Sequence, residues 1–162
     1  MTSEAPSSTL LSDLDPKLYS MLQSTENTSA FNSHSSGITP DDFARSQALS
    51  ETFVVLSTSY DLNGVEFVSV IEGIDLPFFA VQWHPEKNVF ELGKTTDGRP
   101  YEAIVHSPEA IAVTQYLANF FVSAARKNEH KFSDPADEAA AIIWNYPVST
   151  TLAPEFEQSY LF

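Results

Sequence analysis

The chain has 162 residues and a formal net charge of −14, from 22 acidic and 8 basic side chains. With 43% hydrophobic and 12% aromatic residues, it has the composition of a globular domain with a real core. So acidic a chain repels nucleic acid and anionic membranes, so neither is expected as a partner. No apolar run approaches the roughly 20 residues that span a bilayer. The chain contains no cysteine, which excludes disulfides, thiolate metal sites and a cysteine nucleophile within it.

The first third of the chain predicts a flexible tail, a short helix and a long loop. Residues 1–12 are expected to be the tail; the stretch from Met1 to Ser8 is small, polar and acidic and lacks the basic and apolar regions of a signal peptide, so no export signal is predicted. Asp15 and Pro16 suit the N-cap and first position of a helix that runs to about Ser24. Residues 25–41 are rich in Ser, Thr and Asn and predict a loop, and loops of this length often carry function.

Three strands are expected next. The β-branched content of residues 53–58 predicts a strand, and Asn63-Gly64 is a strong hairpin signal. The alternation in residues 65–71 predicts the returning strand. Residues 77–83 are apolar on both faces and indicate an inner strand of a covered sheet, which must stop at Pro85 because proline cannot donate to the ladder.

Helices dominate the end of the chain. Ser107-Pro108-Glu109 predicts the start of a helix with a broad apolar face, and Asp134-Pro135 predicts the start of another that Pro147 ends. Residues 156–162 are expected to form a terminal strand. The order indicates an α/β fold, yet the parallel strands and crossover helices of a doubly wound sheet are missing. The chain therefore looks like the C-terminal portion of something longer.

His84 and Glu86 form the strongest candidate site, since they follow the buried strand at the end where open α/β sheets keep their chemistry. A histidine can accept a proton from a nucleophile and return it to a leaving amine. A carboxylate beside it fixes the tautomer and stabilises the imidazolium. Spacing alone is a weak signal, and a loop histidine packed on Trp83 explains it equally well. No Gly-x-Ser-x-Gly or Gly-x-Cys-x-Gly elbow supplies a nucleophile.

The other histidines carry less information. His34 lies in the polar loop, where a histidine is usually just solvated. His106 and His130 are expected to be structural, because one precedes a helix and the other closes one. A zinc site from His34, His84 and His106 is an alternative, but no metal-ligand spacing supports it.

Several segments together resemble the γ-glutamyl hydrolases, the folate polyglutamate-cleaving relatives of class I glutamine amidotransferases. The likeness covers about residues 10 to 162. Its residues are Phe79-Ala80-Val81-Gln82-Trp83-His84-Pro85-Glu86-Lys87, Ala118-Asn119-Phe120-Phe121-Val122, Ala125-Arg126-Lys127-Asn128, Phe156-Glu157-Gln158-Ser159-Tyr160-Leu161-Phe162, and His34 ahead of Gly37-Ile38-Thr39-Pro40 and Phe43.

The resemblance implies a flavodoxin-like, three-layer αβα fold of the class I glutamine amidotransferase type, with an incomplete sheet. Residues 13–162 would be a partial domain that lacks the nucleophile-bearing N-terminal half. His84 would be the general base of a Cys-His-Glu mechanism, Glu86 its orienting carboxylate, and His34 part of the pocket for a γ-glutamyl or folate polyglutamate substrate. No cofactor or metal is implied, and the family works in vacuoles, lysosomes or outside the cell.

Two functions remain open at this level. In the first, the chain supplies the His-Glu part of a γ-glutamyl hydrolase site, is inactive alone, and works with the missing half. In the second, it is a non-catalytic module that binds γ-glutamyl ligands or pairs with a full-length homologue. An unpaired sheet edge and an uncovered apolar face would in either case make the chain poorly soluble or dependent on a partner.

Overall fold

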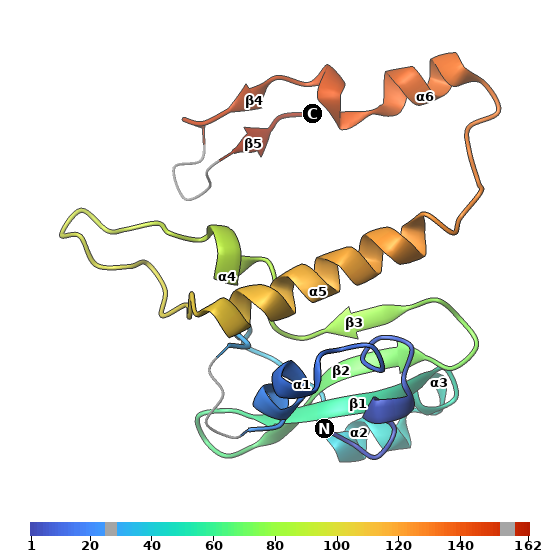
Figure 1. Ribbon diagram of the computed structural model, residues 1–162, viewed down its shortest axis with the longest axis vertical. Helices are drawn as coiled ribbons and strands as arrows, with labels where there is room; N and C mark the ends of the chain where they lie inside the picture. The colour runs from blue at the N-terminus through green and yellow to red at the C-terminus, as the bar shows by residue number, and fades with distance from the viewer. Residues whose placement is uncertain (25–28, 153–157) are drawn as a thin grey trace. The chain divides into compact units, whose positions relative to one another are not determined.

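The protein divides into two compact units, residues 1–122 and 123–162, in a computed structural model that describes residues 1–24, 29–152 and 158–162. No helix in these ranges is both long and apolar enough to cross a membrane. The first unit holds a small sheet with helices on both faces, and its mixed composition of helices and strands confirms the α/β class expected from the sequence (Figure 1).

The sheet has three antiparallel strands in the order β1-β2-β3. The strands are β1 (Phe53–Tyr60), β2 (Glu66–Gly73) and β3 (Phe79–Val81). The hairpin forms where Asn63-Gly64 predicted it, with Gly64 at a φ of 79° that a residue with a side chain rarely adopts. The prediction of an inner strand at residues 77–83 is wrong, because among the described residues β3 pairs with β2 alone and lies at an edge of the sheet. The central strand is β2, which explains its run of buried residues.

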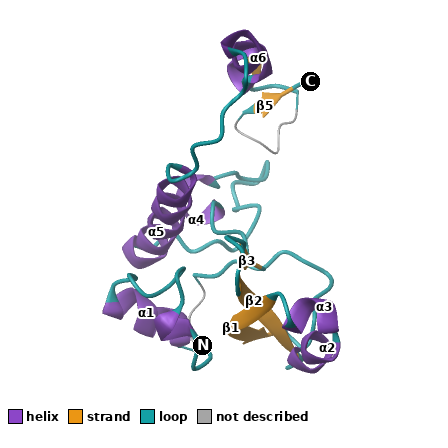
Figure 2. Ribbon diagram, turned by 90° about the vertical axis from the view of Figure 1, so that its right-hand side faces the viewer, coloured by secondary structure: helices purple, strands orange, loops and turns teal. Residues whose placement is uncertain are grey.

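Helices α2 (Pro40–Arg45) and α3 (Gln47–Ser50) cover one face of the sheet, and α1 (Pro16–Gln23) lies on the other side (Figure 2). Neither α2 nor α3 was predicted. The cap explains α2: Thr39 accepts a hydrogen bond from the N–H of Asp42, and Pro40 occupies the first helical position. Asp15 caps α1 in the same way, as expected from the sequence.

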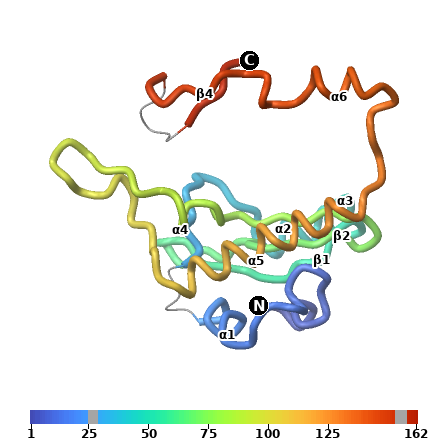
Figure 3. The backbone as a smooth tube through the Cα atoms, turned by 45° about the horizontal axis from the view of Figure 1, so that its top comes forward, coloured from blue at the N-terminus to red at the C-terminus, as the bar shows by residue number. Residues whose placement is uncertain are grey.

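The longest helix, α5 (Pro108–Ala125), runs beside the sheet (Figure 3). Its Phe120 ring meets the ring of Phe79 in β3 edge to face, with centroids 4.8 Å apart. A single turn, α4 (Lys87–Phe90), lies between β3 and α5. The predicted start of α5 is confirmed.

Residues 1–12 do not form the flexible tail that the sequence predicted. Ala5, Leu10 and Leu11 are at most 4% exposed and belong to the core cluster with Leu56 and Val70 of the sheet. A 3-10 turn at Ala5–Ser7 begins the segment. Its apolar residues gain free energy by covering the sheet face, which outweighs the polar character of their neighbours in sequence.

The second unit contains short elements. They are α6 (Pro135–Ala141), a 3-10 turn (Ile143–Asn145), and the paired strands β4 (Val148–Ser149) and β5 (Ser159–Tyr160). Asp134 caps α6 as predicted, but the helix ends at Ala141 rather than reaching Trp144. The terminal strand predicted over residues 156–162 is confirmed at Ser159–Tyr160, while residues 156 and 157 lie outside the described ranges.

Candidate active site

His84 and Glu86 lie in the turn between β3 and α4, and their side chains contact each other. Nδ1 of His84 is 2.9 Å from Oε1 of Glu86. Because a carboxylate only accepts, Nδ1 carries the proton and the lone pair of the neutral ring is on Nε2. Within the described residues, no hydrogen bond engages that Nε2 atom. The pair can therefore take up a proton at Nε2 while Glu86 stabilises the resulting imidazolium.

The pair is accessible rather than buried. The His84 side chain is 42% exposed and that of Glu86 is 62% exposed. Solvent screens their attraction at this exposure, so the contact orients the imidazole more than it stabilises the fold. An incoming substrate or a further polypeptide segment could cover the pair, and dehydration would strengthen the contact.

The backbone of this turn is held from several directions. The N–H of His84 donates to the carbonyl oxygen of Phe31 at 2.9 Å. The hydroxyl of Thr114, on α5, donates to the carbonyl oxygen of Pro85 at 2.6 Å. Thr114 is 9% exposed, so its hydroxyl requires this partner. These contacts fix the turn against the loop before it and the helix after it.

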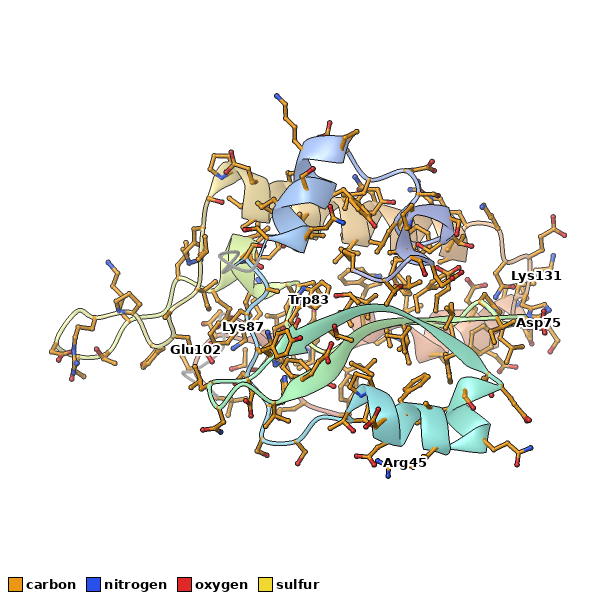
Figure 4. The ribbon with its side chains drawn as sticks, turned by 90° about the horizontal axis from the view of Figure 1, so that it is seen from below. Arg45, Asp75, Trp83, Lys87, Glu102 and Lys131 are labelled. Atoms are coloured by element: carbon orange, nitrogen blue, oxygen red, sulfur yellow. The ribbon has the colours of Figure 1, made fainter. Side chains whose placement is uncertain are left out.

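Lys87 adds a half-buried ion pair beside the turn. Its ammonium group pairs with the carboxylate of Glu102, and the two side chains are 17% and 28% exposed. The Lys87 Nζ atom also lies 5.2 Å from the centre of the Phe31 ring, within the range of a cation–π contact. Figure 4 shows Lys87 and Glu102 side by side near Trp83, with Arg45 on the distant helix α2.

His34 lies in the exposed loop ahead of α2 and has its own set of contacts. Its Nδ1 donates to the carbonyl oxygen of Ser36 at 2.9 Å, and its Nε2 lies 3.2 Å from Oδ1 of Asn32. The imidazole also meets the Phe67 ring edge to face, with centroids 5.1 Å apart. The hydrogen bond from His84 to Phe31 attaches the start of this loop to the turn, only three residues before His34.

A cavity of about 410 Å³ lies in this region of the first unit. Its lining includes Trp83, the residue before His84, and Asn32, the partner of His34. Hydroxyl-bearing residues of β1, Ser57 to Tyr60, form another wall. Neither His34 nor His84 is among the lining residues; the cavity reaches their segments through Asn32 and Trp83.

His106 and His130 have separate surroundings. Nδ1 of His106 donates to the backbone carbonyl of Asn88 at 2.8 Å. His130 lies in the second unit. Among the residues that the structure describes, no group of three or more His, Cys, Asp or Glu side chains is arranged to hold a metal ion, so the zinc alternative has no geometric support.

Sequence reasoning missed the residues that hold the turn. Thr114 carried a signal, because it is a polar residue within the apolar face of α5. Asn88 directly follows the motif, but nothing in its spacing indicated that its side chain is 1% exposed. Glu102 and Phe31 gave no signal, since their contacts with Lys87 arise only when three separate segments meet.

Several curated proteins are similar in sequence to this chain over most of its length. No protein-family model matches the chain. The chain is 39% identical to γ-glutamyl hydrolase B of Dictyostelium discoideum and to the human γ-glutamyl hydrolase, each over 81% of its length. It is 35% identical to the γ-glutamyl hydrolase of Rattus norvegicus over 99% of the chain.

Only part of each relative is matched. The aligned region spans 36% of the Dictyostelium protein, 39% of the human protein and 48% of the rat protein. The chain thus spans less than half the length of these relatives. Over most of its own length, it is a γ-glutamyl hydrolase homologue that corresponds to part of such a protein.

Proposed function

We propose that the chain supplies the general-base part of a γ-glutamyl hydrolase site, with His84 as the base and Glu86 as the carboxylate that orients it. The observation that carries the proposal is the 2.9 Å contact between Nδ1 of His84 and Oε1 of Glu86, which leaves Nε2 as the basic atom. The names of the relatives support hydrolysis of γ-glutamyl bonds as the reaction. Folate polyglutamate is the proposed substrate.

The nucleophile must come from elsewhere, because the chain has no cysteine. In the proposed reaction, a cysteine thiol of a second segment gives its proton to Nε2 of His84 and attacks the γ-glutamyl carbonyl carbon. The imidazolium, stabilised by Glu86, returns the proton to the departing amine. Water then hydrolyses the thioester and frees the thiol. Since base and nucleophile act as a unit, the chain alone is inactive in this proposal.

His34 is proposed to shape the substrate pocket. It lies outside the hydrogen-bonded pair, on the loop that the Phe31 carbonyl attaches to His84. The 410 Å³ cavity supports this role, because Asn32 lines the cavity and its Oδ1 atom lies 3.2 Å from Nε2 of His34. In this scheme residues 13–162, together with residues 1–12 that pack in the core of the first unit, form a partial domain that the nucleophile-bearing segment completes.

Reconstitution tests the proposal. The full chain is mixed with the nucleophile-bearing segment of a homologous γ-glutamyl hydrolase, and release of glutamate from a γ-glutamyl peptide is followed. We expect cleavage that neither piece shows alone, lost in His84→Ala and retained in His130→Ala, a histidine of the other unit. An inactive mixture that forms a folded complex, or unchanged activity in His84→Ala, would overturn the proposal.

The absence of cysteine also supports a second candidate, a non-catalytic module that binds γ-glutamyl ligands or pairs with a full-length homologue. Its sheet is small, and β1 and β3 are edge strands that could pair with another chain. Calorimetric titration with folate polyglutamate, and separately with the homologue, tests this candidate. Heat in either titration, together with an inactive reconstituted complex, would favour the module, and two silent titrations would exclude it.

A further inference from the structure

Asn88 is among the most deeply buried side chains of the described residues, with 1% exposure. Its Nδ2 group donates to two backbone carbonyls from separate segments, Ser29 at 3.0 Å and Val105 at 2.8 Å. The backbone carbonyl of Asn88 itself accepts from Nδ1 of His106 at 2.8 Å. A single residue of α4 therefore joins the segment that precedes His34 to the segment that leads into α5.

The chemistry of this position requires a primary amide. Two carbonyl oxygens converge on one buried point, and an amide nitrogen offers two N–H donors there. An apolar side chain of the same volume would remove both of these buried hydrogen bonds, to the carbonyls of Ser29 and Val105, which is costly. A carboxylate would place negative charge against two acceptors.

The contact with Ser29 continues toward His34. Two residues after Ser29, the carbonyl of Phe31 accepts the hydrogen bond from His84, and the Phe31 ring lies under Lys87. Residues 29–31 are thus attached to the turn at successive points, and His34 follows three residues later. The turn on the other side of these contacts carries the His84–Glu86 pair.

We propose that Asn88 is a positioning residue, whose side-chain amide holds residues 29–34 against the turn that carries His84 and Glu86. It acts through Ser29 and Phe31 and touches neither imidazole. The inference rests on the proposed function only in assigning His34 and His84 to one site.

Histidine ring spectra of the ¹⁵N-labelled full chain test this role. The chain has four histidines, so one His→Gln variant for each assigns the ring signals. In Asn88→Leu we expect the ring signals of both His34 and His84 to move and the nuclear Overhauser contacts between residues 29–31 and the turn to be lost. The signal of His130 should stay in place.

Thr114→Val is the matched control. It removes a buried hydrogen bond to the same turn, at Pro85, and among the described residues no hydrogen bond of Thr114 goes to residues 29–34. We expect it to move His84 and to leave His34 unchanged. The proposal fails if Asn88→Leu leaves both ring signals in place, or if Thr114→Val moves His34 as far as Asn88→Leu does.

A measurement on the unsubstituted chain covers the case in which Asn88→Leu does not fold. The two amide protons of the Asn88 side chain should exchange slowly with water and show Overhauser contacts to Ser29 and Val105. Fast exchange would contradict the proposed role. None of these signals depends on catalysis, so an inactive reconstituted protein would refute the proposed function without deciding the role of Asn88.

Discussion

The carboxylate of Glu72, in the central strand, accepts the backbone N–H of Leu10 at 2.9 Å. Its other oxygen accepts the N–H of Thr9 at the same distance, and Glu72 is only 8% exposed. A carboxylate in a strand that alternates apolar and polar residues is usually on the solvent-facing side. In the structure Glu72 faces inward, because two backbone donors of residues 1–12 satisfy its charge.

Glu72→Gln should therefore destabilise the fold. The amide keeps one acceptor but turns N–H donors toward another donor, and hydrogen bonds to charged groups contribute about 1.5–3 kcal/mol each. We expect a loss of about 2 kcal/mol in the free energy of unfolding, measured by urea denaturation. Glu66→Gln, on the same strand but without a side-chain hydrogen bond among the described residues, is the control. Equal losses in the two variants would contradict the anchoring role of Glu72.

The free energy of unfolding is expected to fall at alkaline pH because of Tyr116. Its hydroxyl donates to the carbonyl of Leu10 at 2.8 Å, and burial, followed by the charge of Asp13, raises the pKa of Tyr116 above its usual 10.0. Because the folded state holds this proton more tightly than the unfolded state, the stabilisation is complete below pH 10 and is lost as pH rises through the raised pKa.

Tyr116→Phe should remove that part of the pH dependence. We expect its free energy of unfolding to be about 1 kcal/mol lower at neutral pH, from the lost hydrogen bond. The difference in free energy of unfolding between this variant and the unsubstituted chain should shrink as the pH passes 10, because only the unsubstituted chain loses the contribution of Tyr116. The other tyrosines titrate in both proteins and do not affect this difference. Urea denaturation series across this range measure the difference, and a gap that does not narrow would show that the titration of Tyr116 is uncoupled from folding.

The ion pair between Lys87 and Glu102 should matter more than a surface pair. Its side chains are 17% and 28% exposed, whereas those of Arg45 and Asp42 are 73% and 60% exposed. We expect Lys87→Met to lower the free energy of unfolding by about 1–3 kcal/mol, between the values typical of exposed and buried pairs. Arg45→Met should cost less than about 1 kcal/mol. Thermal unfolding of both variants compares them, and equal shifts would mean that solvent screens the Lys87 pair fully.

Glu86→Gln tests the orienting role in the reconstituted enzyme. A glutamine amide can turn either its oxygen or its NH₂ toward Nδ1, so the tautomer of His84 is no longer fixed. We expect kcat to fall by about 10²-fold or more with little change in KM, as befits a group that acts on the general base. Kinetics with a γ-glutamyl peptide measure both constants. A rise in KM alone would show that Glu86 binds the substrate and does not orient the base.

Local signals determined much of this protein. The caps at Asp15 and Asp134, the hairpin at Asn63-Gly64 and the start of α5 are set by residues adjacent in sequence, so they were predictable. The approach of Glu86 to His84 was a hypothesis from the same kind of local signal, because only Pro85 separates the partners and both follow the end of the strand.

Only the tertiary structure decided the rest. Whether residues 77–83 form an inner or an edge strand depends on which strands pair, and the inward direction of Glu72 depends on donors more than sixty residues away. The contacts of Asn88 and Thr114 likewise join distant segments. Periodicity and capping report the chain's immediate neighbourhood, whereas the partner of a buried polar group is fixed by packing, which no local pattern encodes.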